Sequence, residues 1–147
     1  MGYAESLECE TCHSKKEYYF GIGFSDSTLF SKSQDKMLSF VKNQISNEKS
    51  LASILLFLDQ HKNARPTYNS GRKPFICNKC NLGSIKFFVE LKDDQTIFKS
   101  PFYCEVCNSH LKPISNEQFI KLKQNQYCEN CQRRTFFQYT SGVINWD

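Results

Sequence analysis

The sequence lacks any long apolar run. Its longest continuous apolar stretch, Ile54 to Leu58, ends at Asp59 and is far shorter than the roughly 20 residues that a membrane-spanning helix needs. The opening segment, Met1 to Glu8, has neither the basic part nor the apolar part of a secretory signal. We therefore expect a cytoplasmic protein, in a reducing compartment where thiols stay free of disulfides.

Motifs of the familiar enzyme classes are also missing. The sequence has only three histidines, and none belongs to a His-Glu-x-x-His zinc protease motif. A zinc deaminase would need glutamate two positions after a histidine, but Lys15, Asn63 and Lys112 stand there. Neither a Walker loop nor a serine-nucleophile motif occurs. We expect this protein not to be an enzyme.

The sequence is instead rich in cysteine, and every cysteine belongs to a Cys-x-x-Cys pair. A two-residue gap lets both sulfurs of one tight turn reach the same ion, and two such turns complete a tetrahedral zinc shell. Filled shells leave no open position for a catalytic water, so the sites are structural. The pattern predicts two Zn²⁺ ions held by Cys9, Cys12, Cys77, Cys80, Cys104, Cys107, Cys128 and Cys131.

Two schemes join the four turns into two sites. The third and fourth turns are separated by 20 residues, a usual spacing for a four-cysteine site, which favours joining them and leaves the first turn with the second. This scheme divides the chain into a ribbon at 1–100, with a helical insertion at about 31–62, and a second ribbon at 101–147. The alternative joins the second and third turns across 23 residues and the first with the fourth.

Strand-like runs follow three of the turns, which predicts small zinc-ribbon hairpins in an α+β fold. Runs rich in aromatic residues occupy 15–20, 85–91 and 133–139. The remaining turn leads to Pro113, which suits only an edge strand.

Between the first two turns the apolar period changes to that of helices. Met37, Leu38, Val41 and Ile45 share one face after a capping-box pair of Ser31 and Gln34. A second helix is expected from near Ser50, with an inward face of Leu51, Ile54, Leu55 and Leu58. A short third helix is expected from Asn116 to Lys123, capped by Ser115 with Gln118 three residues later. The stretch 63–74, with two prolines and a glycine, is expected to be an exposed loop.

Charge gives little support for nucleic-acid binding. The formal net charge is +4, but each zinc ion with four thiolates carries minus two, so two sites bring the total to about zero. Nucleic-acid binding through a local basic surface is the alternative function. The residues that could contact phosphates and bases are Arg133, Arg134, Phe137, Arg72 and Lys73. Four thiolates also suit iron, so a rubredoxin-like redox protein is a further alternative.

The chain resembles uncharacterised bacterial zinc-ribbon proteins with rubredoxin-like metal turns. The similarity consists of Met1-Gly2-Tyr3 before the first turn, the run Gly21-Ile22-Gly23-Phe24, a helical insertion, three further turns and a closing Trp146-Asp147. Such proteins usually place glycine after the second cysteine, where this chain has His13, Asn81, Asn108 and Gln132. The resemblance implies metal binding and a bacterial origin, and no activity.

These observations favour a non-catalytic zinc protein that presents a rigid surface as a protein-interaction or adaptor module. Its partner and its oligomeric state are not specified by any motif.

Overall fold

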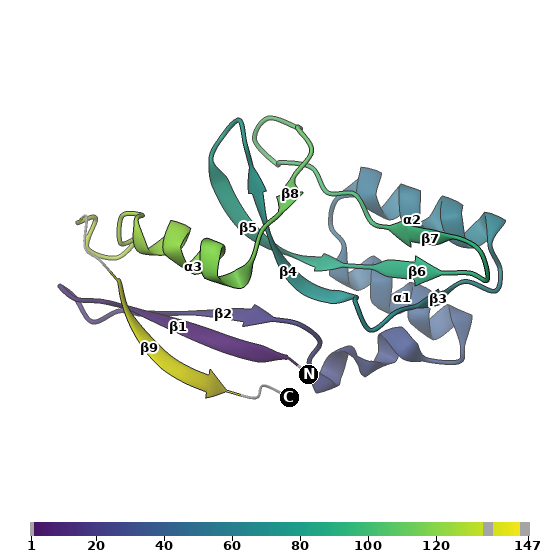
Figure 1. The fold of residues 1–147 in the computed structure, drawn as a ribbon, viewed down its shortest axis with the longest axis horizontal. Coiled ribbons are helices and arrows are strands. Elements are labelled where there is room, and N and C mark those ends of the chain that lie inside the picture. Colours follow the sequence, from purple (N-terminus) through teal and green to yellow (C-terminus); the bar gives the residue numbers. More distant parts are fainter. Residues whose placement is uncertain (1, 134–136, 145–147) are drawn as a thin grey trace.

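The computed structural model describes residues 2–133 and 137–144, with side chains described for 2–133. The fold is α+β, as expected, and the helices α1 and α2 lie between the first two cysteine turns (Figure 1). In chain order the elements are β1 (Tyr3–Cys9), β2 (Lys15–Phe20), the 3-10 helix η1 (Phe24–Phe30), α1 (Gln34–Gln44), α2 (Glu48–Gln60), β3 (Arg65–Pro66), β4 (Gly71–Cys77), β5 (Leu82–Phe88), β6 (Glu90–Lys92), β7 (Ile97–Lys99), β8 (Lys112–Pro113), α3 (Asn116–Gln124) and β9 (Phe137–Ile144).

Three antiparallel sheets divide the length of the molecule. The first has the order β2-β1-β9 and lies beside α3 at one end of Figure 1. The second, β5-β4-β8, occupies the middle, and the third, β3-β6-β7, lies over α1 and α2 at the other end. The edge position expected for the strand at Pro113 is confirmed, because β8 ends the strand order β5-β4-β8 of the described sheet.

Helices α1 and α2 cover one face of the third sheet. Their inward residues Met37, Val41, Ile54 and Leu58 are buried with Leu91 of β6, as the helical period predicted. Asn47 caps α2 by accepting a hydrogen bond from the Ser50 amide, so α2 begins slightly before the expected start. In the described part of the chain, the helices are all too short or too polar to cross a bilayer.

The capping box expected at Ser31 and Gln34 is wrong. The N-cap of α1 is Ser33, and Ser31 ends η1, an element that the sequence did not predict. The equivalent prediction for α3 is confirmed, because Ser115 and Gln118 cap each other reciprocally.

A separate apolar cluster joins α3 to the first sheet. Phe119 and Ile120 of α3 pack on Leu7 of β1 and on Tyr18 and Phe20 of β2. The ring of Phe119 meets both aromatic rings edge-on, at centroid distances of 5.3 and 6.1 Å. This packing places the end of α3 beside the turn between β1 and β2.

The expected loop at 63–74 is also wrong in part, because Arg65–Pro66 form β3 and the end of the stretch belongs to a longer strand. Residues from Gly71 onward form β4, and Arg72 pairs with Gly21 through two backbone hydrogen bonds of 2.7 and 2.8 Å. The Arg72 guanidinium forms an ion pair with Asp26, which is 1% exposed and also accepts from the Gly23 amide. A buried carboxylate needs such partners, so Arg72 is fixed by η1 rather than free in a loop.

The Asp26–Arg72 pair predicts a large effect of one substitution. Arg72→Ala leaves the buried carboxylate without its cation, and we expect a loss of about 3–5 kcal/mol in the free energy of unfolding. Lys62→Ala removes an exposed pair with Asp59 and is expected to change stability by less than about 1 kcal/mol. Denaturant unfolding of both variants provides the measurement, and equal losses would contradict a structural role for the buried pair.

Candidate metal centres

All four Cys-x-x-Cys segments adopt one backbone conformation. In each, the amide that follows the second cysteine donates to the carbonyl of the first, at 2.8–2.9 Å. The donors are His13, Asn81, Asn108 and Gln132, and all four have positive φ, between 54° and 56°. These are the positions at which related turns were expected to carry glycine, so the left-handed conformation is retained without it.

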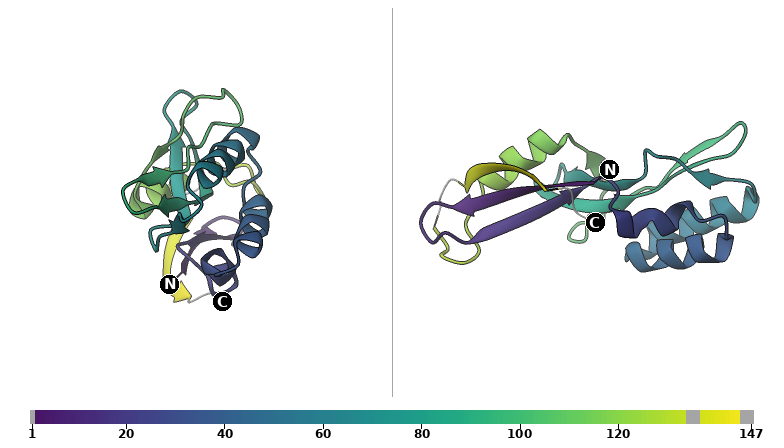
Figure 2. Two further views of the ribbon diagram at one scale, coloured as in Figure 1. Left: turned by 90° about the vertical axis from the view of Figure 1, so that its right-hand side faces the viewer. Right: turned by 90° about the horizontal axis from the view of Figure 1, so that it is seen from below.

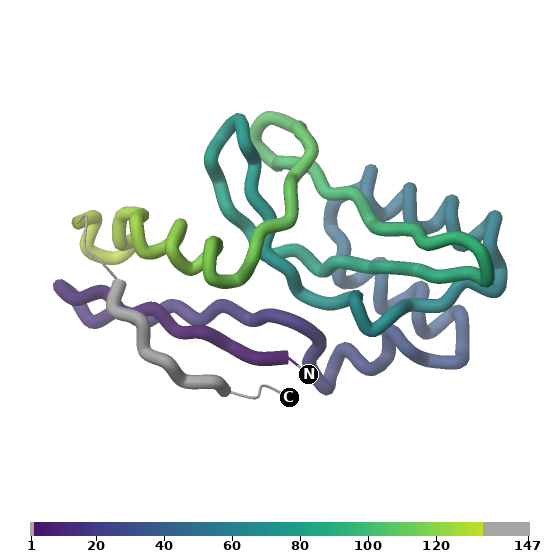
Figure 3. The backbone as a smooth tube through the Cα atoms, in the orientation of Figure 1, coloured from purple at the N-terminus to yellow at the C-terminus, as the bar shows by residue number. Residues whose placement is uncertain are grey.

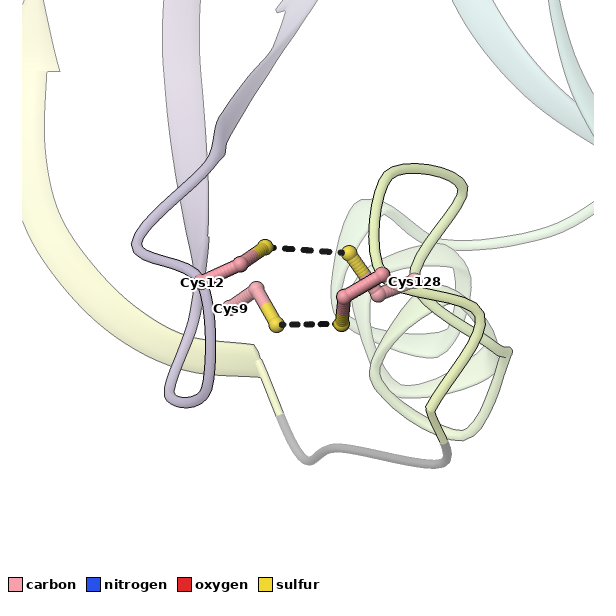
Figure 4. A group of neighbouring side chains, drawn as sticks. Cys9, Cys12 and Cys128 are labelled. Carbon is pink, nitrogen blue, oxygen red and sulfur yellow. Dashed lines mark hydrogen bonds between the residues drawn. The ribbon is translucent and has the colours of Figure 1, made fainter.

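The first centre joins the two ends of the described chain. Cys9 ends β1, Cys12 follows in the β1–β2 turn, and both face the turn that follows α3 (Figure 4). The Cys12 and Cys128 sulfurs are 3.6 Å apart, and the Cys9 and Cys131 sulfurs are 3.8 Å apart. Cys9 and Cys128 are buried, whereas the other two are half-buried.

The second centre joins two neighbouring loops in the middle of the molecule. The turn between β4 and β5 carries Cys77 and Cys80, and it lies beside the loop that carries Cys104 and Cys107 (Figure 3). The Cys77 and Cys107 sulfurs are 3.4 Å apart, and the Cys80 and Cys104 sulfurs are 3.9 Å apart. Buried apolar residues, among them Phe88, surround this group.

The sulfur spacing fits one metal ion in each group. All four sulfurs of a group lie within 4.8 Å of one another, and none of the eight cysteines forms a disulfide. In a tetrahedron with zinc–sulfur bonds of about 2.3 Å, neighbouring sulfurs are about 3.8 Å apart. The four measured distances of 3.4–3.9 Å bracket that value.

The thiols of each group differ in acidity. A side-chain hydrogen bond from Ser14 lowers the pKa of Cys12 to about 6, and one from Ser109 lowers that of Cys107 to about 6. Hydrogen bonding with Cys107, together with burial, raises the pKa of Cys80 to about 12. Without a cation, one thiolate forms easily and suppresses ionisation of its neighbours. A divalent cation would remove this repulsion and allow all four thiols to ionise.

Ser14 and Ser109 are functional residues that the sequence analysis did not identify. Each stands two positions after the second cysteine of a turn, and each centre contains one such serine. The Ser14 hydroxyl lies 3.1 Å from the Cys12 sulfur and 3.4 Å from the Cys128 sulfur. Aligning the four turns would have revealed these serines, since leucine and arginine occupy the other two equivalent positions.

The favoured pairing of the turns is wrong, and the alternative pairing is correct. The first turn meets the fourth, and the second meets the third. The reason is β1, which the sequence did not predict and which pairs with both β2 and β9. This sheet holds the first turn near the C-terminal part of the chain. Each centre therefore takes two ligands from 1–100 and two from 101–147, and the division into those two domains stays a prediction.

The residues proposed for nucleic-acid contact do not form one described surface. Arg72 is bound to Asp26, and the Lys73 ammonium lies over the Phe88 ring at 4.6 Å from its centroid. Arg133 is exposed beside the first centre, and its carbonyl accepts from the Cys128 amide. The other two candidates, Arg134 and the side chain of Phe137, lie outside the described residues.

Comparisons with protein-family models, curated proteins and solved structures return no match. The similarity to bacterial zinc-ribbon proteins therefore stays a prediction.

The positive φ angles predict an effect on stability. Asparagine tolerates the left-handed conformation, whereas a glutamine there is strained by roughly 1 kcal/mol. We expect Gln132→Gly to raise the free energy of unfolding of the metal-loaded protein by about that amount, although the hydrogen bond from Gln132 to the Glu129 carbonyl is lost. Asn108→Gly is the matched control, and it should give a smaller gain in denaturant unfolding. Equal gains would contradict the strain argument.

The serine contacts predict an effect on metal affinity. Ser14→Ala removes the hydroxyl that stabilises the Cys12 thiolate, so the pKa of Cys12 rises and more protons compete with the metal at pH 7. We expect about a ten-fold weaker affinity at the first centre, measured by competition with a chromogenic chelator. The second centre provides an internal control because its own serine is intact. Equal weakening at both centres would contradict a local effect.

Proposed function

We propose that this protein is a non-catalytic structural zinc protein, with one Zn²⁺ ion in each four-cysteine group. The observation that carries the proposal is the convergence of eight sulfurs into two groups with tetrahedral spacing. Cysteine-only shells are typical of structural zinc, because catalytic zinc keeps a coordination position for water. The chemistry that the ion supplies is charge neutralisation and cross-linking, and this chain supplies all four ligands at each site.

Each ion would cross-link segments that the sheets and the packing of α3 already bring together. At the first centre the linked residues are 122 positions apart along the chain. Structural zinc contributes roughly 10–16 kcal/mol in small domains, which exceeds or equals the net stability of most domains, about 5–15 kcal/mol. Removal of zinc should therefore separate the first sheet and the β4–β5 hairpin from their partner turns.

The helical layer depends less directly on the metal. Its apolar cluster contains residues of α1, α2 and β6 but no cysteine among the described residues. We therefore expect α1 and α2 to keep part of their helicity in metal-free protein, while the order around both centres is lost.

Iron bound by the same four cysteines is the alternative to zinc. Iron bound by four thiolates absorbs visible light and changes colour on reduction, whereas zinc does neither. Colourless protein with stoichiometric zinc supports the structural role. The adaptor role toward a protein partner is part of this proposal, motivated by closed shells that leave the metals no chemistry of their own.

Metal analysis of cysteine variants tests the sites and their pairing together. Wild-type protein should contain two equivalents of zinc. The double variant Cys9→Ser/Cys128→Ser should retain about one equivalent, because both residues belong to one centre. The matched double variant Cys9→Ser/Cys77→Ser should lose both. Elemental analysis by mass spectrometry provides the measurement. Equal metal content in the two double variants would contradict the pairing, and metal-free folded wild-type protein would contradict the proposed function.

A further inference from the structure

The third sheet has one face that none of the described helices covers. Helices α1 and α2 lie on only one side of β3, β6 and β7 in the right-hand view of Figure 2. Leu91 and Phe98 are paired across the strands and point toward those helices, since both pack in the helical cluster. Successive side chains alternate between faces, so the neighbours of Leu91 and Phe98 point to the other face, where Lys92, Ile97 and Lys99 are exposed and Glu90 is buried.

The residues on this open face are mainly basic. We call the face the basic face and define it by Arg65, Lys92, Ile97 and Lys99, all of which are exposed. Arg65 pairs with Lys92, and Lys92 pairs with Ile97, so these three form one cross-strand row. Lys99 stands in the next row, opposite Glu90.

The pairing of Arg65 with Lys92 is unfavourable for stability alone. Like charges directly opposite on neighbouring strands destabilise a sheet. Within residues 2–133, neither side chain forms an ion pair with a carboxylate. The Arg65 guanidinium donates to the Lys62 and Ala64 carbonyls, which holds it in place but leaves its charge uncompensated. Such a row is expected where an anion is bound.

The acidic side chains near the face are occupied. Glu90 accepts hydrogen bonds from Thr67 at 2.7 Å and from Asn69 at 2.8 Å, and its carboxylate forms an ion pair with the Lys99 ammonium at 3.8 Å. The Thr67 hydrogen bond contributes most to lowering the pKa of Glu90. Asp93, in the turn after β6, is directed to His61 at the end of α2, at 2.9 Å. Glu90 therefore offsets Lys99, and the charges of Arg65 and Lys92 leave the basic face with a positive excess.

The exposed Tyr68 ring follows β3, the edge strand of the third sheet. Phe30, on which this ring rests, packs against the helical cluster, so Tyr68 lies on the helix side of that edge, next to the basic face and not on it. The bonds of Thr67 and Asn69 to Glu90 fix the turn between them, and this turn presents Tyr68, which is 91% exposed. The Tyr68 ring rests on Phe30, with centroids 5.2 Å apart and planes inclined by 26°. A large ring held in place in this way can stack on another ring without an ordering cost of its own.

We propose that the basic face binds the phosphate backbone of a single-stranded nucleic acid, and that Tyr68 stacks on one of its bases where the strand passes over the β3 edge of the sheet. Charge complementarity selects a polyanion, and the combination of cations with an exposed aromatic and an exposed isoleucine selects one with accessible base faces. A duplex hides those faces within its stack, and an acidic peptide has no equivalent of them. This inference goes beyond the structural zinc role and does not use the metal ions.

Fluorescence anisotropy with labelled oligo-dT and oligo-rU of about 15 nucleotides tests the proposal, with titrations repeated at several salt concentrations. Both strands share the phosphate and base chemistry, so the two arms distinguish DNA from RNA as the source. We expect binding to weaken steeply with salt. Each phosphate contact contributes about 0.7 to the slope of log affinity against log salt, so Lys92→Gln/Lys99→Gln should reduce that slope by about 1.4.

Two controls separate the basic face from general charge and from misfolding. Lys36→Gln/Lys42→Gln removes the same charge from exposed positions on α1, outside the basic face, and should leave binding unchanged. Every variant should keep the zinc content of the wild type, which shows that it folds. Tyr68→Ala should weaken binding about five-fold or more, whereas Tyr68→Phe should not.

Four outcomes would overturn the proposal. The first is no binding to either strand at about 20 mM salt. The second is equal weakening by the two lysine double variants, which would indicate a non-specific charge effect. The third is equal or tighter binding of a duplex of the same length, and the fourth is displacement of the oligonucleotide by polyglutamate at equal charge concentration. None of these outcomes depends on the zinc analysis, so the proposed structural role is tested separately.

Discussion

The fold depends on two centres, each of which brings four thiols into one small volume. Each Cys-x-x-Cys turn aims two sulfurs at one point, because a residue in the left-handed conformation closes the turn behind them. Four sulfurs within 4.8 Å cannot all be ionised unless a cation shares their charge. The pKa values of Cys12 and Cys131, which lie on opposite sides of the ordinary thiol value, show that the four thiols do not ionise together. The Arg133 amide lowers the pKa of Cys131, but burial and the neighbouring thiols raise it to about 11.

The sheets and helix α3 bring the cysteine turns of each centre together. The first sheet places the β1–β2 turn beside the end of α3, and the packing of Phe119 on Tyr18 and Phe20 fixes that approach. The second sheet places the β4–β5 turn beside the loop that leads to β8. The helical layer takes no part in either centre. Its position under the third sheet instead leaves the cations of the opposite face open to solvent.

The sequence predicted features that depend on local spacing. The four turns, most of the inward positions of α1 and α2, and the cap at Ser115 follow from short-range geometry, and the structure contains them. On α2 the buried cluster includes Phe57, which the sequence did not place inward, and does not include Leu55. The partners of the turns could not be predicted in the same way, because 20 and 23 intervening residues are equally able to span one site. The strand β1 determines which turns meet, because it holds the first turn near the fourth. Its residues, Tyr3 to Cys9, alternate too weakly between apolar and polar to indicate a central strand. The role of Arg72 was likewise hidden, since its partner Asp26 is remote in sequence.

The remote partners of the first centre impose an order of assembly during synthesis. The ribosome releases both turns of the second centre within 30 residues of each other, from Cys77 to Cys107. Cys9 leaves the ribosome early but meets its counterpart only 122 residues later, which at roughly 5–20 residues per second is a delay on the order of ten seconds. During that interval the nascent chain carries an unsatisfied thiol pair. A cell that makes this protein must keep those two sulfurs reduced and away from competing metals until the fourth turn has been synthesised.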